Sequence, residues 1–426
     1  MKEKQCSCCS DYGFSYPVFT KEMKESYTII TPDFFPTHMA LVVRVFRRYG
    51  FNVEILHSRG REVIEKGLEH VHNDMCYPAI CVVGQFIDAL TSGRFDPKRT
   101  ALVLFQTGGG CRASNYIWVL RKALENMGMG YVPVLSVSLN SIERHPGFKL
   151  TLPLLFKSLM ALVYGDMLML LKNQTKPYEK NKGETERLTS HWIEKITEGI
   201  NRGKLLVGPE FRRTLSSIAE SYSKIELTGE KKTKVGIVGE IYVKYSPLGN
   251  NGLEELLEKE GCEVMVPGVL PFFFYMFDNR INASRLYGEK KGVIVSKVGM
   301  KFSRHIEKTM DEVLSSYPQF SRPSTFSMEK KMVDGIIDRG VVMGEGWLLP
   351  AEVAELIELG YSNVICVQPF GCLPNHSVGK GTIRNLRSRY KDANIFPLDY
   401  DASSSCVNQE NRIKLMLSMA RESEKK

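Results

Sequence analysis

The chain lacks, near its start, the basic stretch and apolar segment that a secretory signal requires, so we expect a cytoplasmic protein. It also lacks an uninterrupted apolar run. The most apolar segment, residues 150–171, contains Pro153, Lys157 and Asp166, and a charge at the depth of a bilayer is costly. We therefore predict a buried helix there and no membrane partner.

Clusters of basic residues are scarce as well. The chain has 57 Lys and Arg against 48 Asp and Glu, a net charge of +9, and these residues are spread along its length. Nucleic-acid binders concentrate such charge in arms or patches, so no nucleic-acid partner is expected. The 426 residues, 43% of them hydrophobic, can bury two or three cores without disulfides.

The ten cysteines are therefore free for other uses. In a reducing compartment, cysteines serve as metal ligands, catalysts or core residues more often than as disulfides. Cys6, Cys8 and Cys9 have the composition of a metal-binding tract, but no partner with zinc-site spacing follows them. They fall in residues 1–18, which we expect to form a mobile N-terminal segment.

The rest of the chain alternates short β-rich runs with longer helical patterns, which predicts an α/β fold of two or more Rossmann-like parallel-sheet domains with a cleft between them. We place the first domain at residues 19–230, with a helical extension over about 172–230, and the second at residues 231–426. A final helix is expected from Gln409. The predicted strands are residues 27–31, 52–56, 101–106, 132–139, 234–238, 263–266, 363–367 and 394–398.

A glycine-rich loop follows the predicted strand at residues 101–106. Gly108, Gly109 and Gly110 precede Cys111 and a helical stretch, and the amides of such a loop favour anions, including a thiolate. A phosphate-binding loop is the alternative, but the lysine and the Ser or Thr that complete it are missing. The loop is a candidate cofactor-binding segment, and Cys111 is a candidate metal ligand.

Two further cysteines occupy comparable places. Cys76 stands two residues before Pro78, a residue favoured in the first turn of a helix, and Cys372 follows the predicted strand at residues 363–367. Ligands collect beyond the carboxyl ends of strands in open α/β sheets, so Cys76, Cys111 and Cys372 are expected to converge. Cys81, Cys366 and Cys406 are additional candidates, although Cys81 and Cys366 also suit a core.

Polar residues near these loops are candidates for acid–base chemistry. Glu240 follows the predicted strand at residues 234–238, and Tyr242 and Lys244 come just after it. The dinucleotide spacing G-x-G-x-x-G is not met there, so a nicotinamide site is not indicated. We assign Glu240 and His376 as candidate catalytic residues, with Glu345 as a comparable carboxyl group.

Several long blocks in one order resemble the 2-hydroxyacyl-CoA dehydratase superfamily, and more closely the dehydratase-like C-terminal portion of CoA-dehydratase-activase-related proteins. The blocks are NDMCYPAICVVGQFIDAL, FQTGGGCRASNYIWVLRKAL, VGEIYVKYSPLGNNGLEELLE, VQPFGCLPNHSVGKGTIRNLRSRY and DYDASSSCVNQENRIKLML. The resemblance runs from about Phe19 to about Leu417. The ATPase domains of the activase are not among these blocks.

The resemblance implies Rossmann-like domains with a [4Fe-4S] cluster, or a linked double cluster, held by cysteines in the cleft. It further implies an ATP-hydrolysing activase as the donor of a low-potential electron, and a homodimer or heterodimer is compatible with it. Carried over, Cys76, Cys111 and Cys372 are the ligands, and Cys81, Cys366 and Cys406 are those that a larger cluster would need. The expected activity is reduction or dehydration of a small or CoA-linked substrate.

Two other interpretations fit the same residues. One is a non-catalytic electron-transfer or assembly module that docks the activase, with four protein ligands on the cluster and no small-molecule pocket. The other is a zinc-stabilised α/β protein. Composition and charge do not choose among them.

Overall fold

A computed structural model describes residues 16–106, 110–138 and 145–424. It contains two four-stranded sheets, and every strand pair in both is parallel. The α/β class and the parallel sheets predicted from the sequence are confirmed. All eight predicted strands are present, with ends displaced by one or two residues.

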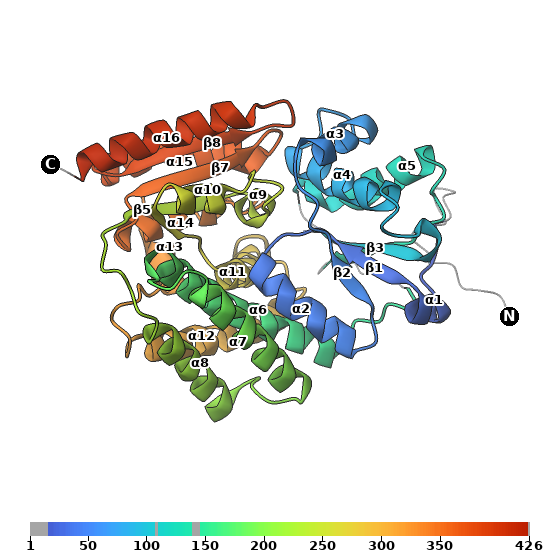
Figure 1. Ribbon diagram of the computed structural model, residues 1–426, viewed down its shortest axis with the longest axis horizontal. Coiled ribbons are helices and arrows are strands. Elements are labelled where there is room, and N and C mark those ends of the chain that lie inside the picture. The colour runs from blue at the N-terminus through green and yellow to red at the C-terminus, as the bar shows by residue number, and fades with distance from the viewer. Residues whose placement is uncertain (1–15, 107–109, 139–144, 425–426) are drawn as a thin grey trace.

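The first sheet has the strand order β2-β1-β3-β4. Most residues of these strands are buried on both faces, as parallel strands covered by helices require. Helices α3, α4 and α5 lie on one side of this sheet and α2 on the other (Figure 1). The strands are β1 (Thr28–Thr31), β2 (Val53–Ile55), β3 (Thr100–Gln106) and β4 (Val134–Ser138), and the helices are α1 (Lys21–Ser26), α2 (Pro36–Arg48), α3 (Arg61–His70), α4 (Tyr77–Thr91) and α5 (Tyr116–Asn126).

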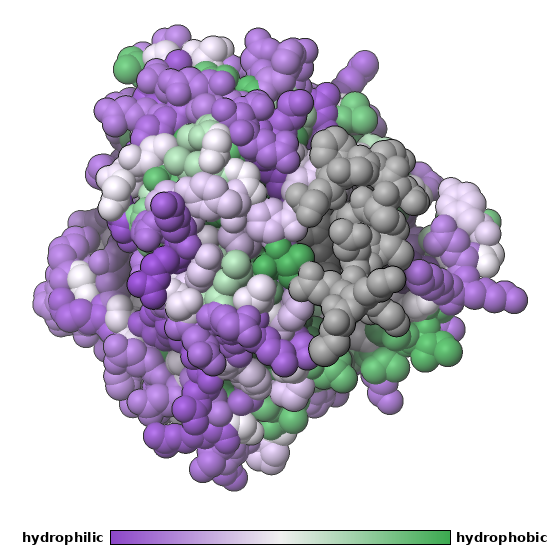
Figure 2. All heavy atoms as spheres, turned by 90° about the vertical axis from the view of Figure 1, so that its right-hand side faces the viewer, coloured by the Kyte–Doolittle hydropathy of each residue, from purple (hydrophilic) through white to green (hydrophobic). Residues whose placement is uncertain are grey.

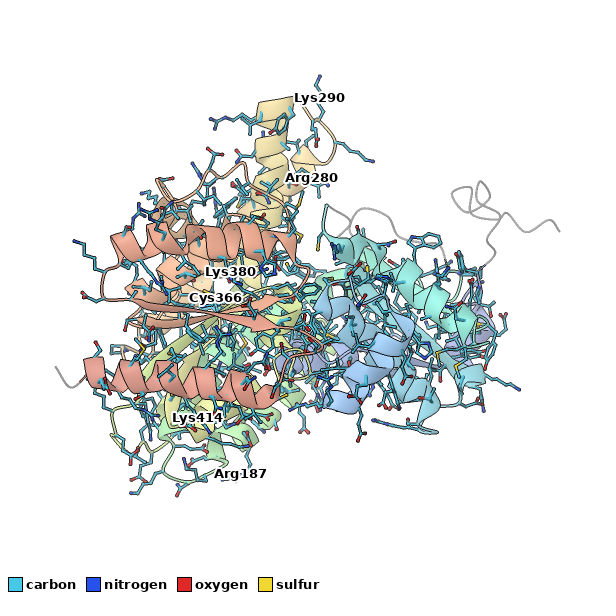
Figure 3. The ribbon with its side chains drawn as sticks, turned by 90° about the horizontal axis from the view of Figure 1, so that it is seen from above. Arg187, Arg280, Lys290, Cys366, Lys380 and Lys414 are labelled. Carbon is cyan, nitrogen blue, oxygen red and sulfur yellow. The ribbon has the colours of Figure 1, made fainter. Side chains whose placement is uncertain are left out.

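The second sheet has the corresponding order β6-β5-β7-β8. Helices α15 and α16 lie on its opposite faces, and the pair α11 and α12 projects from the body with Lys290 near its tip (Figure 3). The strands are β5 (Thr233–Gly239), β6 (Cys262–Met265), β7 (Asn363–Pro369) and β8 (Asn394–Tyr400). The helices are α9 (Ile241–Tyr245), α10 (Leu253–Lys259), α11 (Leu270–Tyr287), α12 (Val293–Leu314), α13 (Phe326–Met332), α14 (Leu348–Glu358), α15 (Gly381–Arg389) and α16 (Cys406–Ser423).

Between the two sheets in the sequence come α6 (Leu152–Thr175), α7 (Glu184–Asn201) and α8 (Gly208–Ser223), which pack on one another and on α2 (Figure 1). Within the described residues, one stretch is long and apolar enough to cross a membrane, Leu152–Tyr178, and 67% of its most apolar window is buried inside the protein. The buried helix predicted there is confirmed. The face beside the first sheet is largely hydrophilic, with hydrophobic side chains in scattered groups (Figure 2).

Asp166 ties α6 to both halves of the chain. Its carboxylate lies 2.8 Å from Nε2 of His38, which is buried in α2, and accepts the backbone N–H groups of Val269 and Leu270 at 2.7 and 2.8 Å. The N–H groups of Val269 and Leu270 lie at the start of α11, where no carbonyl of the helix itself can accept their hydrogen bonds. One buried carboxylate therefore joins an element of each sheet unit to α6.

Each sheet has one point where the strand order reverses, between β1 and β3 in the first and between β5 and β7 in the second. Ligands of open α/β sheets bind beyond the carboxyl ends of strands at such points. The segments that follow β1 and β5 touch, because the Ser246 hydroxyl donates a hydrogen bond to the Asp33 carbonyl at 2.9 Å. The two reversal points therefore face each other.

Candidate metal centre

Cys76 is the residue immediately before α4, and its thiol is buried. The sulfur lies 2.9 Å from the hydroxyl of Tyr116, the first residue of α5. The next residue, Tyr77, donates its backbone N–H to the Phe370 carbonyl at 3.0 Å. A Cβ at Gly371 would stand 2.9 Å from the Cα of Cys76, so the loop after β7 rests directly on this turn.

Cys111 precedes a short 3-10 helix, Arg112–Asn115, and is half-buried. Its sulfur accepts the Ala113 backbone N–H at 3.5 Å. Gly110 lies under the Met343 side chain, whose Cε would be 3.1 Å from a Cβ at that position. Gly108 and Gly109 lie outside the described residues, so of the predicted cofactor-binding glycines only Gly110 is placed beside Cys111.

Cys372 lies three residues beyond the end of β7 and is buried. Its sulfur accepts a hydrogen bond from the Asn375 side-chain amide at 3.3 Å. Cys111 and Cys372 thus follow the reversal-point strands β3 and β7, whereas Cys76 lies between helices α3 and α4 and not beyond a strand end, as its place in the sequence had suggested. Each of the three sulfurs has a polar partner within its own unit. Hydrogen bonds to sulfur of this kind tune the potential of sulfur-ligated iron.

The carboxyl groups of Glu240 and Glu345 affect the pKa values of these thiols. Burial, with smaller contributions from the charges of Glu345 and Glu240, raises the pKa of Cys111 to about 11. Burial, then Glu240 and Glu345, raise the pKa of Cys372, while the pKa of Cys76 is raised by burial and by Glu240. The N–H groups at the helix starts were expected to stabilise thiolates, but in the metal-free protein burial and the nearby carboxyl groups outweigh them.

Glu240 and Glu345 are themselves held by backbone amides of α9. Glu240 accepts the Val243 N–H and Glu345 accepts the Ile241 N–H, both at 2.9 Å. Burial raises the pKa of Glu240 to about 8, with the Glu345 charge as the next cause. Because this pKa lies above 7, Glu240 is mostly protonated at neutral pH. The residue also retains some solvent-accessible surface, so small molecules can contact it.

This donor set suits a soft cation. Three thiols and two carboxyl groups share one region, and thiolates bind zinc and iron–sulfur clusters. Among the residues that the structure describes, no three His, Cys, Asp or Glu side chains lie close enough together to hold one metal ion. Each thiolate of a cubane cluster binds a different iron atom, so the thiolates stand farther apart than ligands of a single ion. The chemistry of the three thiols is compatible with either kind of centre.

The other predicted site residues have different surroundings. Cys81 is fully buried in α4, where burial raises its pKa and the Glu240 charge adds to the rise, so it lies near the same carboxyl. Cys366 is buried inside β7 of the second sheet (Figure 3), where the charges that act on its thiol are those of Arg387 and Glu352. Cys406 is exposed as the first residue of α16, and His376 is also exposed.

Two groups at the site were not predicted. Tyr116 and Asn375 contact the sulfurs of Cys76 and Cys372, and both belong to the quoted sequence blocks. Asn375 follows Cys372 by three residues, a spacing that reaches back over one helical turn. Tyr116 is 40 residues from Cys76, and no local pattern reports that contact. The N-terminal Cys6, Cys8 and Cys9 lie outside the described residues.

Comparison with known proteins does not assign the chain to a family. No protein-family model matches it, and no curated protein matches it. The resemblance to the dehydratase superfamily stays a prediction based on the sequence blocks alone.

Proposed function

We propose that this protein holds an iron–sulfur cluster through Cys76, Cys111 and Cys372, in a cleft between two Rossmann-like units. The observation that carries the proposal is that the turn bearing Cys76 packs directly on the loop that leads to Cys372, while Cys111 and Cys372 each follow a strand at a reversal point of a parallel sheet. The Glu240 charge raises the pKa of all three thiols, so the three lie around one carboxyl. These groups are largely protonated in the metal-free protein, and a bound cation would favour their ionised forms.

The chain's own residues would supply ligands, hydrogen bonds and a proton. The three thiols lose their protons on binding metal, which offsets their raised pKa values. Tyr116, Ala113 and Asn375 lie beside the sulfurs and would stabilise their negative charge. Glu240, with a pKa of about 8, would act as a general acid toward a bound substrate. A cluster with three protein ligands supplies one iron position for that substrate.

The proposed reaction is reduction or dehydration of a small or CoA-linked molecule, driven by a low-potential electron from an ATP-hydrolysing activase in the cytoplasm. His376 is exposed, so Glu240 is the stronger candidate for the acid. Whether the protein forms a homodimer or a heterodimer does not alter this chemistry.

A non-catalytic electron-transfer module is the second candidate, and one observation favours it. Phe370 and Leu373 flank Cys372, yet 46% and 62% of their surfaces are exposed. Apolar side chains exposed beside a redox centre suit a docking protein. Cys81 would be the fourth ligand of such a cluster, because its thiol lies near the same Glu240 carboxyl.

The decisive experiment is anaerobic reconstitution with iron and sulfide, followed by iron analysis and electron paramagnetic resonance of the reduced protein. A single cluster gives about four iron atoms per chain and a double cluster about eight. Cys111→Ala should lower the iron content and change the spectrum. Cys262→Ala is the control, because Cys262 is a free cysteine, more deeply buried than Cys111, and lies in β6 at the edge of the second sheet.

Three outcomes separate the interpretations. A reconstituted protein without iron overturns the cluster, and colourless protein with bound zinc favours the zinc interpretation. If Cys81→Ala lowers the iron content as Cys111→Ala does, the cluster has four protein ligands and the electron-transfer module is favoured. If Cys81→Ala leaves it unchanged, the open iron position stands.

A further inference from the structure

A series of buried acidic side chains runs through the second unit behind the thiols. Glu329 of α13, Glu352 and Glu355 of α14 and Glu345 just before α14 are all more than nine-tenths buried. Lys244 of α9 is the buried ammonium that faces them. Carboxylates are rarely buried unless they are paired or protonated, so this series calls for an explanation.

The inner end of the series is connected through α9. Lys244 lies 2.8 and 3.0 Å from the two carboxylate oxygens of Glu352. The backbone N–H of the same lysine donates to the Glu240 carbonyl at 2.7 Å, so one helical turn links the ion pair to the residue beside the thiols. Glu345 accepts the N–H of Ile241, the first residue of that turn.

The outer end is organised by the segment that leads into α13. Glu355 accepts the backbone N–H of Ser324 at 2.7 Å, and Glu307 of α12 accepts that of Phe326 at 2.7 Å. Glu329 lies one turn further along α13. Glu307 is only half-buried and is near Asp311, an exposed residue paired with Arg322. The series therefore reaches solvent at α12.

Glu329 is the residue that simple packing does not explain. Its Oε2 atom is buried and has no hydrogen-bond partner in the part of the chain that the structure describes. The charged groups that act on it come from three neighbouring helices: Glu355 and Glu352 from α14, Glu307 from α12 and Lys244 from α9. The fourth neighbour, α11, faces α13 with Asp278, which is paired with Lys330. A buried carboxyl oxygen without a partner is one that a proton or a water molecule would satisfy.

The charges do not balance. Four buried carboxyl groups face one ammonium, and Lys244 is already occupied by Glu352. Burial raises the pKa of Glu355 to about 7, and burial and the Glu355 charge raise the pKa of Glu329. At neutral pH the series therefore holds protons, and it releases or takes them up close to that pH.

We propose that Glu329, Glu355, Glu352, Lys244 and Glu345 form a proton relay that carries protons from Glu307 at the surface to Glu240 beside the thiols. The inference rests on the proposed function, since it requires electrons to arrive at the site. For each electron that the activase partner delivers and the substrate keeps, Glu240 gives one proton to the substrate and regains one from the relay. Only O–H and N–H bonds are broken and formed along the relay.

The first test needs no cluster. Infrared spectroscopy of the metal-free protein at neutral pH should show the C=O band of protonated, buried carboxyl groups. Glu329→Gln should remove part of that band, whereas Glu289→Gln, an exposed residue of the loop between α11 and α12, should leave it unchanged. Absence of the band in the unmutated protein would overturn the relay.

The second test asks whether the protons follow the electron. In the reconstituted protein the reduction potential should fall as pH rises, by about 59 mV for each tenfold fall in proton concentration if one proton accompanies one electron. Glu355→Gln and Glu329→Gln should slow proton uptake after reduction at least tenfold, without changing the iron content or the slope, because they remove steps of the relay and leave its end point, Glu240, in place. Glu289→Gln should match the unmutated protein.

The two proposals fail differently. A protein that assembles no cluster contradicts the proposed function, and the relay falls with it. A protein that assembles its cluster but has a potential independent of pH contradicts the relay alone. Equal rates of proton uptake in the unmutated protein and Glu329→Gln would assign the carboxyl groups a purely structural role.

Discussion

The backbone N–H of Tyr77 donates a hydrogen bond to the carbonyl of Phe370 at 3.0 Å. The first residue belongs to the helix that follows Cys76, and the second begins the loop that leads to Cys372. One main-chain contact therefore sets the spacing of two thiols that are 296 residues apart in the sequence (372 − 76). The geometry of the candidate site depends on how the two units meet at this contact.

Gly371→Ala tests that dependence. The residue has φ of +75°, and an added Cβ would lie 2.9 Å from the Cα of Cys76, which is backbone that cannot swing away. We expect a loss of about 2–4 kcal/mol in the free energy of unfolding from strain and crowding together. Iron content after reconstitution should fall as well.

Gly360→Ala is the matched control for this glycine. Gly360 has φ of +88°, and no atom lies within 4 Å of an added Cβ. Gly360→Ala therefore introduces backbone strain but no steric clash. It should lower the free energy of unfolding by about 1–2 kcal/mol and should not alter the iron content. Equal iron loss in both variants would show that the Gly371 contact does not position Cys76.

Lys244→Met should be strongly destabilising. Lys244 and Glu352 are both buried and paired at 2.8 Å, so removing the ammonium leaves an uncompensated carboxyl inside the protein. Loss of one partner of a buried pair costs about 3–5 kcal/mol, measured by urea unfolding. The double variant Lys244→Met/Glu352→Gln should recover most of that loss, and no recovery would mean that packing, rather than charge, is the cause.

The pH dependence of the free energy of unfolding follows from the direction in which folding shifts the pKa of Glu355. Its pKa is raised to about 7 in the folded protein, so the folded state binds this proton more tightly than the unfolded state. The stabilisation is complete below the ordinary carboxyl pKa and is lost as pH rises through about 7. The free energy of unfolding should therefore fall by roughly 1–3 kcal/mol between about pH 5 and about pH 8. Glu355→Gln should flatten this profile, and an unchanged profile would contradict the assignment.

The reactivity of Cys111 offers a test of the carboxyl groups in the metal-free protein. The charges of Glu345 and Glu240 contribute to a pKa of about 11. Glu345→Gln removes one negative charge, so the pKa falls and the thiolate fraction at about pH 8 increases, about tenfold for each unit of pKa. Alkylation of Cys111, followed by mass spectrometry, should accelerate accordingly. Glu289→Gln should leave the rate unchanged.

Much of the fold was predictable because parallel strands are buried on both faces and appear as short β-branched runs between helices. The places of Cys111 and Cys372 after strands were predictable for the same reason. Cys76 lies between two helices, and its nearness to the loop after β7 depends on the contact of Tyr77 with Phe370, which no local pattern reports. The roles of Glu345 and Tyr116 depend on contacts across the fold, and no spacing along the chain reports them. Lys244 follows the same strand end as the candidate acid Glu240, yet its side chain is buried against Glu352.

The position of Asp166 has a consequence for how the chain is made. Its carboxylate joins His38 to the first turn of α11, which begins about a hundred residues later. On the ribosome, the amino-terminal sheet would be synthesised long before Val269 and Leu270 emerge, with α6 still lacking part of its packing surface. We expect the two halves to complete their cores together and to unfold in one transition, so that neither survives as a fragment cut near residue 230.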